Sequence, residues 1–224
     1  MLNSEPSPCP VLAARRPPWD ARLARRLVTP LIHSWVTPNH LTTLRLGVGL
    51  AAAAAFIPGS YGWSNFAAFL LILSNFLDHT DGELARMSGK TSRIGHLYDL
   101  ASDAAVTILL FIAIGVGIAA KHGTELGLPP AILGLAAGTA IALIFYLRLC
   151  IEKLLGKAAT QLASLGGFET EDVLYLLPLA TLSNALVPLL LAASICAPLY
   201  AVWVVIDYQR VLRRDRRMAS GVAG

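Results

Sequence analysis

Six long apolar segments dominate this sequence of 224 residues and constrain its fold more than any other feature. Their approximate bounds are 40–58, 63–86, 94–120, 129–155, 170–187 and 189–210. A helix of about 20 mostly apolar residues crosses the hydrocarbon core of a bilayer. Hydrophobic residues make up 55% of the chain and charged residues only 14%, which is far from the balance of a soluble globular domain. The sequence therefore predicts an all-α integral membrane protein with six transmembrane helices.

A different pattern precedes the first apolar segment. Apolar side chains recur there every four residues, while arginines fall between them: Trp19, Leu23, Leu27, Leu31 and Trp35. This periodicity predicts an amphipathic interfacial helix over residues 19–36, which lies on an anionic membrane surface. Thr37 and Pro38 suit the N-cap and the first turn of the helix that follows.

The chain divides into four predicted regions, without an internal repeat or a second domain. They are a disordered tail (1–18), the amphipathic juxtamembrane helix (19–36), the transmembrane catalytic domain (37–211) and a basic cytoplasmic tail (212–224). With six spans, 17 of the 18 Lys and Arg residues lie on the side of the termini or near that end of a span, and only Lys121 lies opposite. The positive-inside rule makes the terminal side cytoplasmic. We expect a bacterial inner-membrane protein that contacts membrane lipids and no nucleic acid.

Four aspartates lie at the cytoplasmic ends of the second and third spans. Asp78 and Asp81 are three residues apart, and Asp99 and Asp103 are four apart. On a helix these spacings place both side chains on one face. An ionised Asp at the bilayer centre costs about 2.5–3.5 kcal/mol, so four unpaired carboxylates would be strongly unfavourable. The cluster therefore requires cations.

Divalent cations suit this set of ligands. Carboxylate oxygens are typical ligands of Mg²⁺, for which Mn²⁺ can substitute, and Mg²⁺ prefers carboxylates together with substrate phosphates. Two such ions can hold the attacking and the leaving oxygen of a phosphoryl displacement. Gly82, Ala85 and Gly95 lack bulk where a phosphorylated substrate would approach the helices. Close packing between helices explains these small residues equally well.

The aspartates belong to a longer signature that resembles a known family. It reads Asp78-x2-Asp81-Gly82-x2-Ala85-Arg86-x8-Gly95-x3-Asp99-x3-Asp103 and matches every fixed position of the signature of the CDP-alcohol phosphotransferases, or CDP-alcohol phosphatidyltransferases. The six spans, the interfacial helix and Pro38-Asn39-x2-Thr42 are also similar to that family. The resemblance ends in residues 1–18 and at the far C-terminus.

The resemblance implies a phospholipid-synthesising enzyme that moves a phosphatidyl group from a CDP-linked lipid to a polar alcohol and releases CMP. CDP-diacylglycerol is the expected donor, and another CDP-linked molecule is the alternative. Asp78, Asp81 and Asp99 would bind two Mg²⁺ ions, while Asp103 would contact metal and act as the general base. The residues expected to contact the donor are Asn39, Thr42, Gly82, Arg86, Ser92 (or Thr91) and Gly95. A homodimer is also expected from the resemblance.

The acceptor alcohol is encoded elsewhere. Arg148, Lys153 and Arg210 lie at the cytoplasmic ends of the fourth and sixth spans and are candidates for binding it. Such a basic pocket would suit a phosphorylated acceptor, for example glycerol 3-phosphate or inositol phosphate. Basic residues also gather at these helix ends as topology determinants, which is the competing explanation.

Two other functions use acidic residues in membranes. An intramembrane prenyltransferase also uses Mg²⁺ and diphosphates, but it should carry a second Asp-rich motif, and the second half of this chain has no aspartates paired at ligand spacing. A cation transporter should place its carboxylates near the bilayer midplane between repeats. Here the aspartates gather at one end, which favours the transferase.

Overall fold

The protein is an α-helical bundle. The computed structural model describes residues 25–31, 34–89, 92–123, 128–155 and 172–221. Its elements are the short 3-10 helix η1 (Thr29–Leu31) and the helices α2 (Pro38–Phe56), α3 (Tyr61–Ser88), α4 (Arg93–His122), α5 (Pro130–Leu155), α7 (Asp172–Leu182) and α8 (Leu186–Gly221). No strand occurs among these described residues, so the predicted all-α class is confirmed.

Three of the helices are long and apolar enough to cross a membrane. These segments are Arg93–Lys121 of α4, Pro130–Ile151 of α5 and Leu186–Arg214 of α8. Each of the six predicted spans nevertheless overlaps one of the observed helices, and the six-span count stays a prediction. The last helix continues to Gly221, so the predicted basic tail is helical up to that residue. Most of the predicted interfacial helix lies outside the described residues, which begin at Arg25.

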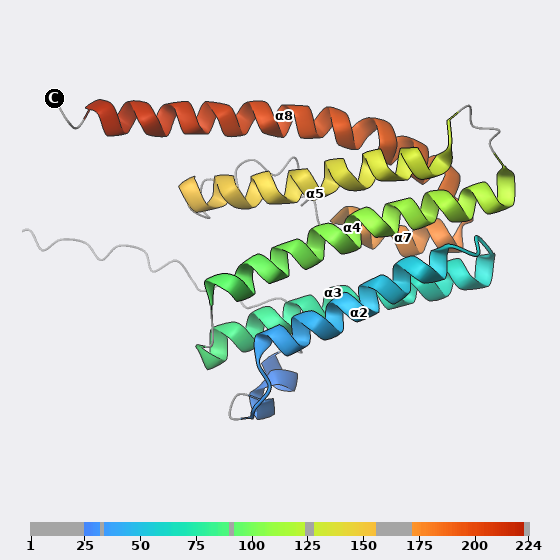
Figure 1. Cartoon of the computed structure of the whole chain (residues 1–224), viewed down its shortest axis with the longest axis horizontal. Helices are drawn as coiled ribbons and strands as arrows, with labels where there is room; N and C mark the ends of the chain where they lie inside the picture. Colours follow the sequence, from blue (N-terminus) through green and yellow to red (C-terminus); the bar gives the residue numbers. More distant parts are fainter. Residues whose placement is uncertain (1–24, 32–33, 90–91, 124–127, 156–171, 222–224) are drawn as a thin grey trace, which may run out of the picture.

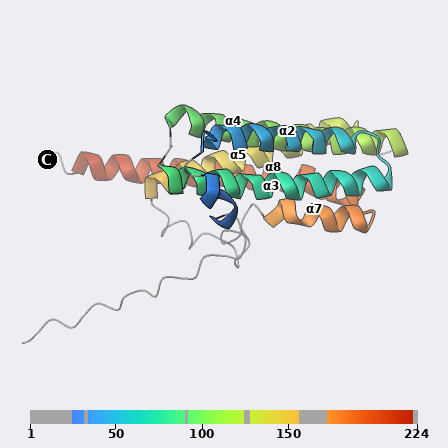
Figure 2. The same ribbon diagram turned by 90° about the horizontal axis from the view of Figure 1, so that it is seen from below.

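The long helices run side by side along the bundle (Figure 1). Contacts join α2 to α3 and α4, α4 to α5, and α5 to α8, while α7 packs against α3 (Figure 2). At one end, which we call the charged end, α2 and α4 begin and α3 and α5 terminate. This arrangement brings the start of α2 beside the start of α4, where Asn39 lies next to Gly95.

Local signals in the sequence set the helix ends at the charged end. Thr37 is the N-cap of α2 with Pro38 as the first helical residue, as predicted, and the Thr37 N–H donates to His40 Nδ1 at 3.3 Å. Helix α3 terminates at Gly89, whose φ of +66° is the left-handed conformation that glycine adopts without strain. Helix α4 begins after Ser92, whose Oγ accepts a hydrogen bond from the N–H of Gly95 at 2.9 Å.

The main hydrophobic core lies at the opposite end, which we call the packed end. Phe56 of α2, Leu110 and Ile114 of α4, and Ala137 of α5 are at most 1% exposed there. Glycines let these helices approach closely, since a Cβ added at Gly134 would lie 2.7 Å from the carbonyl carbon of Phe111. The packed end therefore holds α2, α4 and α5 together and fixes the geometry of the charged end.

Candidate metal and substrate site

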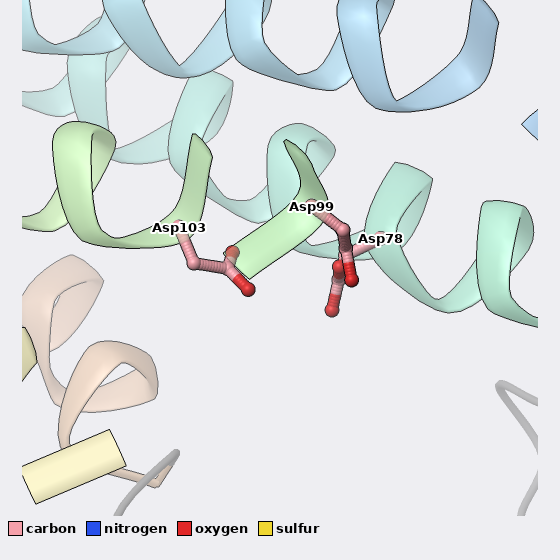
Figure 3. Close-up of side chains that lie close together, drawn as sticks. All are labelled: Asp78, Asp99 and Asp103. Atoms are coloured by element: carbon pink, nitrogen blue, oxygen red, sulfur yellow. The ribbon is translucent and has the colours of Figure 1, made fainter. Parts of the chain in front are cut away.

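Three of the four predicted aspartates converge at the charged end. Asp78 projects from α3, and Asp99 and Asp103 project from successive turns of α4 (Figure 3). One carboxylate oxygen from each lies within 4.8 Å of the others. The three side chains are 35–47% exposed, so the cluster is open to solutes. Oxygen ligands at this spacing fit the divalent cations predicted from the sequence.

Asp81 lies outside this cluster of three. It is buried, with 5% of the residue exposed, one helical turn beyond Asp78. The hydroxyl of Thr42 donates a hydrogen bond to Asp81 Oδ2 at 2.9 Å. Thr42, which the family resemblance assigns to the donor, thus orients a predicted metal ligand. Oδ2 of Asp81 accepts this bond, and Oδ1 does not take part in it.

Arg45 also belongs to this cluster, although the sequence patterns did not predict it as a site residue. Its side chain, 5% exposed, reaches from α2 into the cluster. Nη1 contacts both Asp78 and Asp103, and Nη2 donates to Asp99 Oδ1 at 2.9 Å. A signal for it exists, because Asn39, Thr42 and Arg45 follow one another in steps of three and so share a helix face.

The charge of the cluster supports cation binding. A buried guanidinium already uses all three carboxylates as partners, which shows that their oxygens are arranged around a positive charge. When all three carboxylates are ionised, the single Arg45 guanidinium balances only one of their three negative charges. Like charges at this spacing repel one another, so the remaining charge favours a divalent ion.

The predicted donor residues of α2 and α4 meet beside the cluster. A Cβ added at Gly95 would lie 2.7 Å from Asn39 Oδ1 and 2.9 Å from Ser92 Oγ. The missing side chain of Gly95 therefore makes room for two polar groups and not for a helix backbone. Thr91, the alternative to Ser92, lies outside the described residues.

Gly82 and Arg86 lie together on α3. The atoms nearest to a Cβ added at Gly82 belong to the Arg86 guanidinium, with Nη1 at 3.6 Å. The side chain of Arg86 is 68% exposed, and its Nε donates to Glu83 Oε2 at 2.9 Å. The exposed guanidinium of Arg86 thus lies next to Gly82, which has no side chain. This arrangement suits a bound phosphate.

The three acceptor candidates do not form one cluster. Nζ of Lys153 lies 2.7 Å from Nε2 of His96, which is three residues before Asp99 on α4. Arg148 instead donates to the Tyr200 hydroxyl and lies 5.9 Å from the centre of its ring. Arg210 is exposed on α8 and has no ion pair or hydrogen bond from its side chain among the described residues. Of the three, Lys153 is therefore the one that a contact joins to the aspartate helix.

Similarity to known proteins covers most of the chain. The sequence model of the CDP-alcohol phosphatidyltransferase family matches residues 35–207. Cholinephosphotransferase 1 of Danio rerio is 33% identical over 100 residues, which are 41% of this chain and 26% of that protein. The CDP-diacylglycerol–glycerol-3-phosphate 3-phosphatidyltransferase of Cereibacter sphaeroides is 34% identical over 82 residues, which are 36% of this chain and 37% of that protein. The chain thus matches about a quarter to two fifths of the length of these relatives.

One solved structure extends the comparison to the fold. Mycobacterium tuberculosis phosphatidylinositol phosphate synthase, solved with CDP-DAG bound, superposes with a TM-score of 0.58. The alignment covers 87% of this chain and 94% of that chain at 24% sequence identity. The two proteins therefore share a fold.

Proposed function

Because the chain belongs to the CDP-alcohol phosphatidyltransferase family over residues 35–207, we propose that it transfers a phosphatidyl group from a CDP-linked lipid to a polar alcohol and releases CMP. The observation that carries this proposal is the convergence of Asp78, Asp99 and Asp103, three residues of the family signature, around one site. Family membership favours the transferase over an intramembrane prenyltransferase or a cation transporter.

CDP-diacylglycerol is the donor that we propose. Two observations support it: the enzyme of Cereibacter sphaeroides uses this lipid by name, and the Mycobacterium tuberculosis structure contains it. Asn39, Ser92 and Gly95 would contact the donor from α2 and α4, and Gly82 and Arg86 from α3, with Thr42 beside them. Arg86 supplies a charge-assisted contact for a phosphate.

The aspartates would perform the chemistry together with divalent ions. Asp78, Asp81, Asp99 and Asp103 would hold two Mg²⁺ ions, which supply neutralisation of the diphosphate and of the leaving CMP oxygen. The carboxylate of Asp103 would accept the proton of the acceptor hydroxyl as general base. Arg45 would keep the three clustered carboxylates turned toward one another.

A phosphorylated alcohol, such as glycerol 3-phosphate or inositol phosphate, is the acceptor that we propose. Lys153 is the best placed of the basic candidates, because its ammonium group lies beside His96, one turn before Asp99. Arg148 and Arg210 would contribute positive charge from α5 and α8. An uncharged alcohol is the alternative.

The finer topology belongs to the same proposal. The proposed topology has six spans within residues 37–211. The interfacial helix 19–36 and the terminal segments 1–18 and 212–224 lie on one side. The aspartates then lie near the cytoplasmic surface of a bacterial inner membrane. The excess of Lys and Arg on that side supports this orientation. The enzyme would work as a homodimer.

The decisive experiment mixes the purified full-length protein with CDP-diacylglycerol, Mg²⁺ and a panel of alcohols, and follows CMP release. We expect release with one acceptor, loss of activity in excess EDTA, and recovery with Mg²⁺ or Mn²⁺. Release of CMP at the full rate in EDTA would contradict the two-metal mechanism. Absence of CMP release with every alcohol would contradict the proposed reaction.

A further inference from the structure

Glu83 is a buried carboxylate that binds two arginines. It lies inside the family signature at a position that the signature leaves open, between Gly82 and Ala85. Its side chain is 6% exposed. Oε2 accepts from Nε of Arg86 at 2.9 Å and lies 2.7 Å from its Nη2, while Oε1 accepts from Nε of Arg25 at 2.8 Å. A buried carboxylate with both oxygens paired in this way is unusual enough to require an explanation.

The contact with Arg86 restricts a side chain that is otherwise exposed. Two nitrogens of one guanidinium edge bind Glu83, and the Nη1 end lies over the backbone of Gly82. A long side chain loses rotamer freedom when it binds a ligand, and this loss weakens binding. Because Glu83 has already removed part of that freedom, Arg86 is preorganised for the donor phosphate.

The contact with Arg25 completes the arrangement. Arg25 belongs to the helical segment before η1, in which Val28 is fully buried, so this segment is docked on the bundle. Its guanidinium neutralises the second oxygen of Glu83. Two arginines and one glutamate leave one positive charge at the end of α3, which favours a bound phosphate.

We propose that Glu83 is a positioning residue, which holds the Arg86 guanidinium in the orientation that binds the CDP-linked donor. Arg25 stabilises Glu83 from its other side. This inference rests on the proposed function, because that proposal assigns Arg86 to the donor. A purely structural Glu83 would only attach the N-terminal segment to α3.

A double-mutant cycle separates the two roles. CDP-diacylglycerol binding in detergent is measured by calorimetry for wild type, Glu83→Gln, Arg86→Gln and the double variant. We expect Arg86→Gln to weaken binding roughly 10- to 150-fold, the loss of one charge-assisted contact. Glu83→Gln should weaken it by about 3- to 10-fold, a fraction of that loss, because Arg86 stays present but loses its fixed orientation. In the Arg86→Gln background, Glu83→Gln should have no further effect.

Kinetics and controls sharpen the result. Glu83→Gln should raise the donor KM and leave the acceptor KM unchanged. Arg25→Gln keeps the bonds of Arg86, so it should weaken binding less than Glu83→Gln does. Asp207→Asn on α8 removes a carboxylate outside the site and should bind the donor like wild type. If Glu83→Gln does not yield folded protein, Glu83→Asp, one methylene shorter, should bind more weakly than wild type.

The outcomes distinguish failure of this inference from failure of the proposed function. If wild type does not bind CDP-diacylglycerol, or if Arg86→Gln binds it as tightly as wild type does, the proposed donor site is wrong. If Arg86→Gln weakens binding but neither Glu83 variant does, the donor site stands and the positioning role is overturned. Additive losses in the double variant, or a larger loss from Arg25→Gln, would also overturn the positioning role.

Discussion

The two ends of the bundle use the same small residue for different purposes. At the packed end, a side chain added at Gly134 or Gly117 would run into the backbone of a neighbouring helix. At the charged end, the three atoms nearest to a Cβ added at Gly82 or Gly95 all belong to polar side chains. Glycine therefore brings helices together at one end and leaves space beside polar groups at the other. For Gly82 and Gly95 this difference favours substrate access over helix packing.

Buried charged side chains also distinguish the two ends. Arg45, Asp81 and Glu83 are buried at the charged end, and each is bound to partners from another helix or segment. The fully buried residues of the packed end include the apolar Leu110 and Ile114 and the polar Thr181, whose hydroxyl donates to the carbonyl of Pro178 in its own helix. Burying paired charges contributes little to stability. Between helices in a membrane, close van der Waals packing of small and apolar side chains supplies the attraction, because lipid tails are as apolar as the side chains. We therefore expect the packed end to hold the helices together and the charged end to serve binding and chemistry.

The largest effect that we expect comes from the charged end. Asp103→Asn keeps the shape of the side chain but removes the proton acceptor, so turnover should fall by about 10²–10⁴-fold, the usual contribution of a general base. Donor binding should change far less. The measurement is CMP release under saturating donor and acceptor.

The same variant tests whether catalysis and stability are separate. The amide that Asp103→Asn introduces can still accept a bond from Arg45, and the change relieves repulsion among three clustered carboxylates. The thermal midpoint in detergent should therefore stay at or above that of wild type. Near-normal CMP release would refute the role of Asp103, and a collapse of the thermal midpoint would refute the division between the two ends.

Helical periodicity in the sequence predicted several features of the charged end. Spacings of three and four residues predicted paired aspartates on two spans, and the structure places Asp78, Asp99 and Asp103 in one cluster. Thr37 and Pro38 correctly predicted the start of α2, because capping depends on neighbouring residues.

Contacts between helices could not be predicted in this way. Arg45 reaches the aspartates only because α2 packs against both α3 and α4, and one sequence without a structure gives no register between helices. The same holds for Arg148, which appeared as an acceptor candidate and is joined to Tyr200 of α8. Side chains that meet across helices are decided by tertiary packing, which local periodicity does not encode.

A second prediction compares one lysine from each end. Lys153→Gln should raise the acceptor KM by about 10- to 150-fold, because it removes a charge-assisted contact with the acceptor phosphate. Lys121→Gln, at the packed end of α4, should leave that constant unchanged. Steady-state kinetics with the true acceptor provide the measurement, and the donor KM serves as an internal control. Equal acceptor KM values for both variants and wild type would favour an uncharged alcohol.

The last and smallest effect compares two glycine-to-alanine changes. Gly134→Ala places a Cβ 2.7 Å from the carbonyl carbon of Phe111, so α4 and α5 must move apart. Such overpacking costs about 1–3 kcal/mol, which should lower the thermal midpoint by several degrees. Gly82→Ala meets nothing closer than 3.6 Å, and alanine is the better helix former by about 1 kcal/mol. Its midpoint should therefore be equal to or higher than that of wild type.

The donor KM should respond in the opposite way to the thermal midpoint: it should change in Gly82→Ala and not in Gly134→Ala. The methyl group of Gly82→Ala lies beside the Arg86 guanidinium, where we place the donor, so the donor KM should rise although the fold is intact. Protein with Gly134→Ala that remains folded at low temperature should keep a normal donor KM, since the change is remote from the charged end. Thermal unfolding and CMP release measured on the same preparations give both values. If Gly82→Ala destabilises the protein as much as Gly134→Ala does, and the donor KM stays unchanged, then glycine serves packing at both ends.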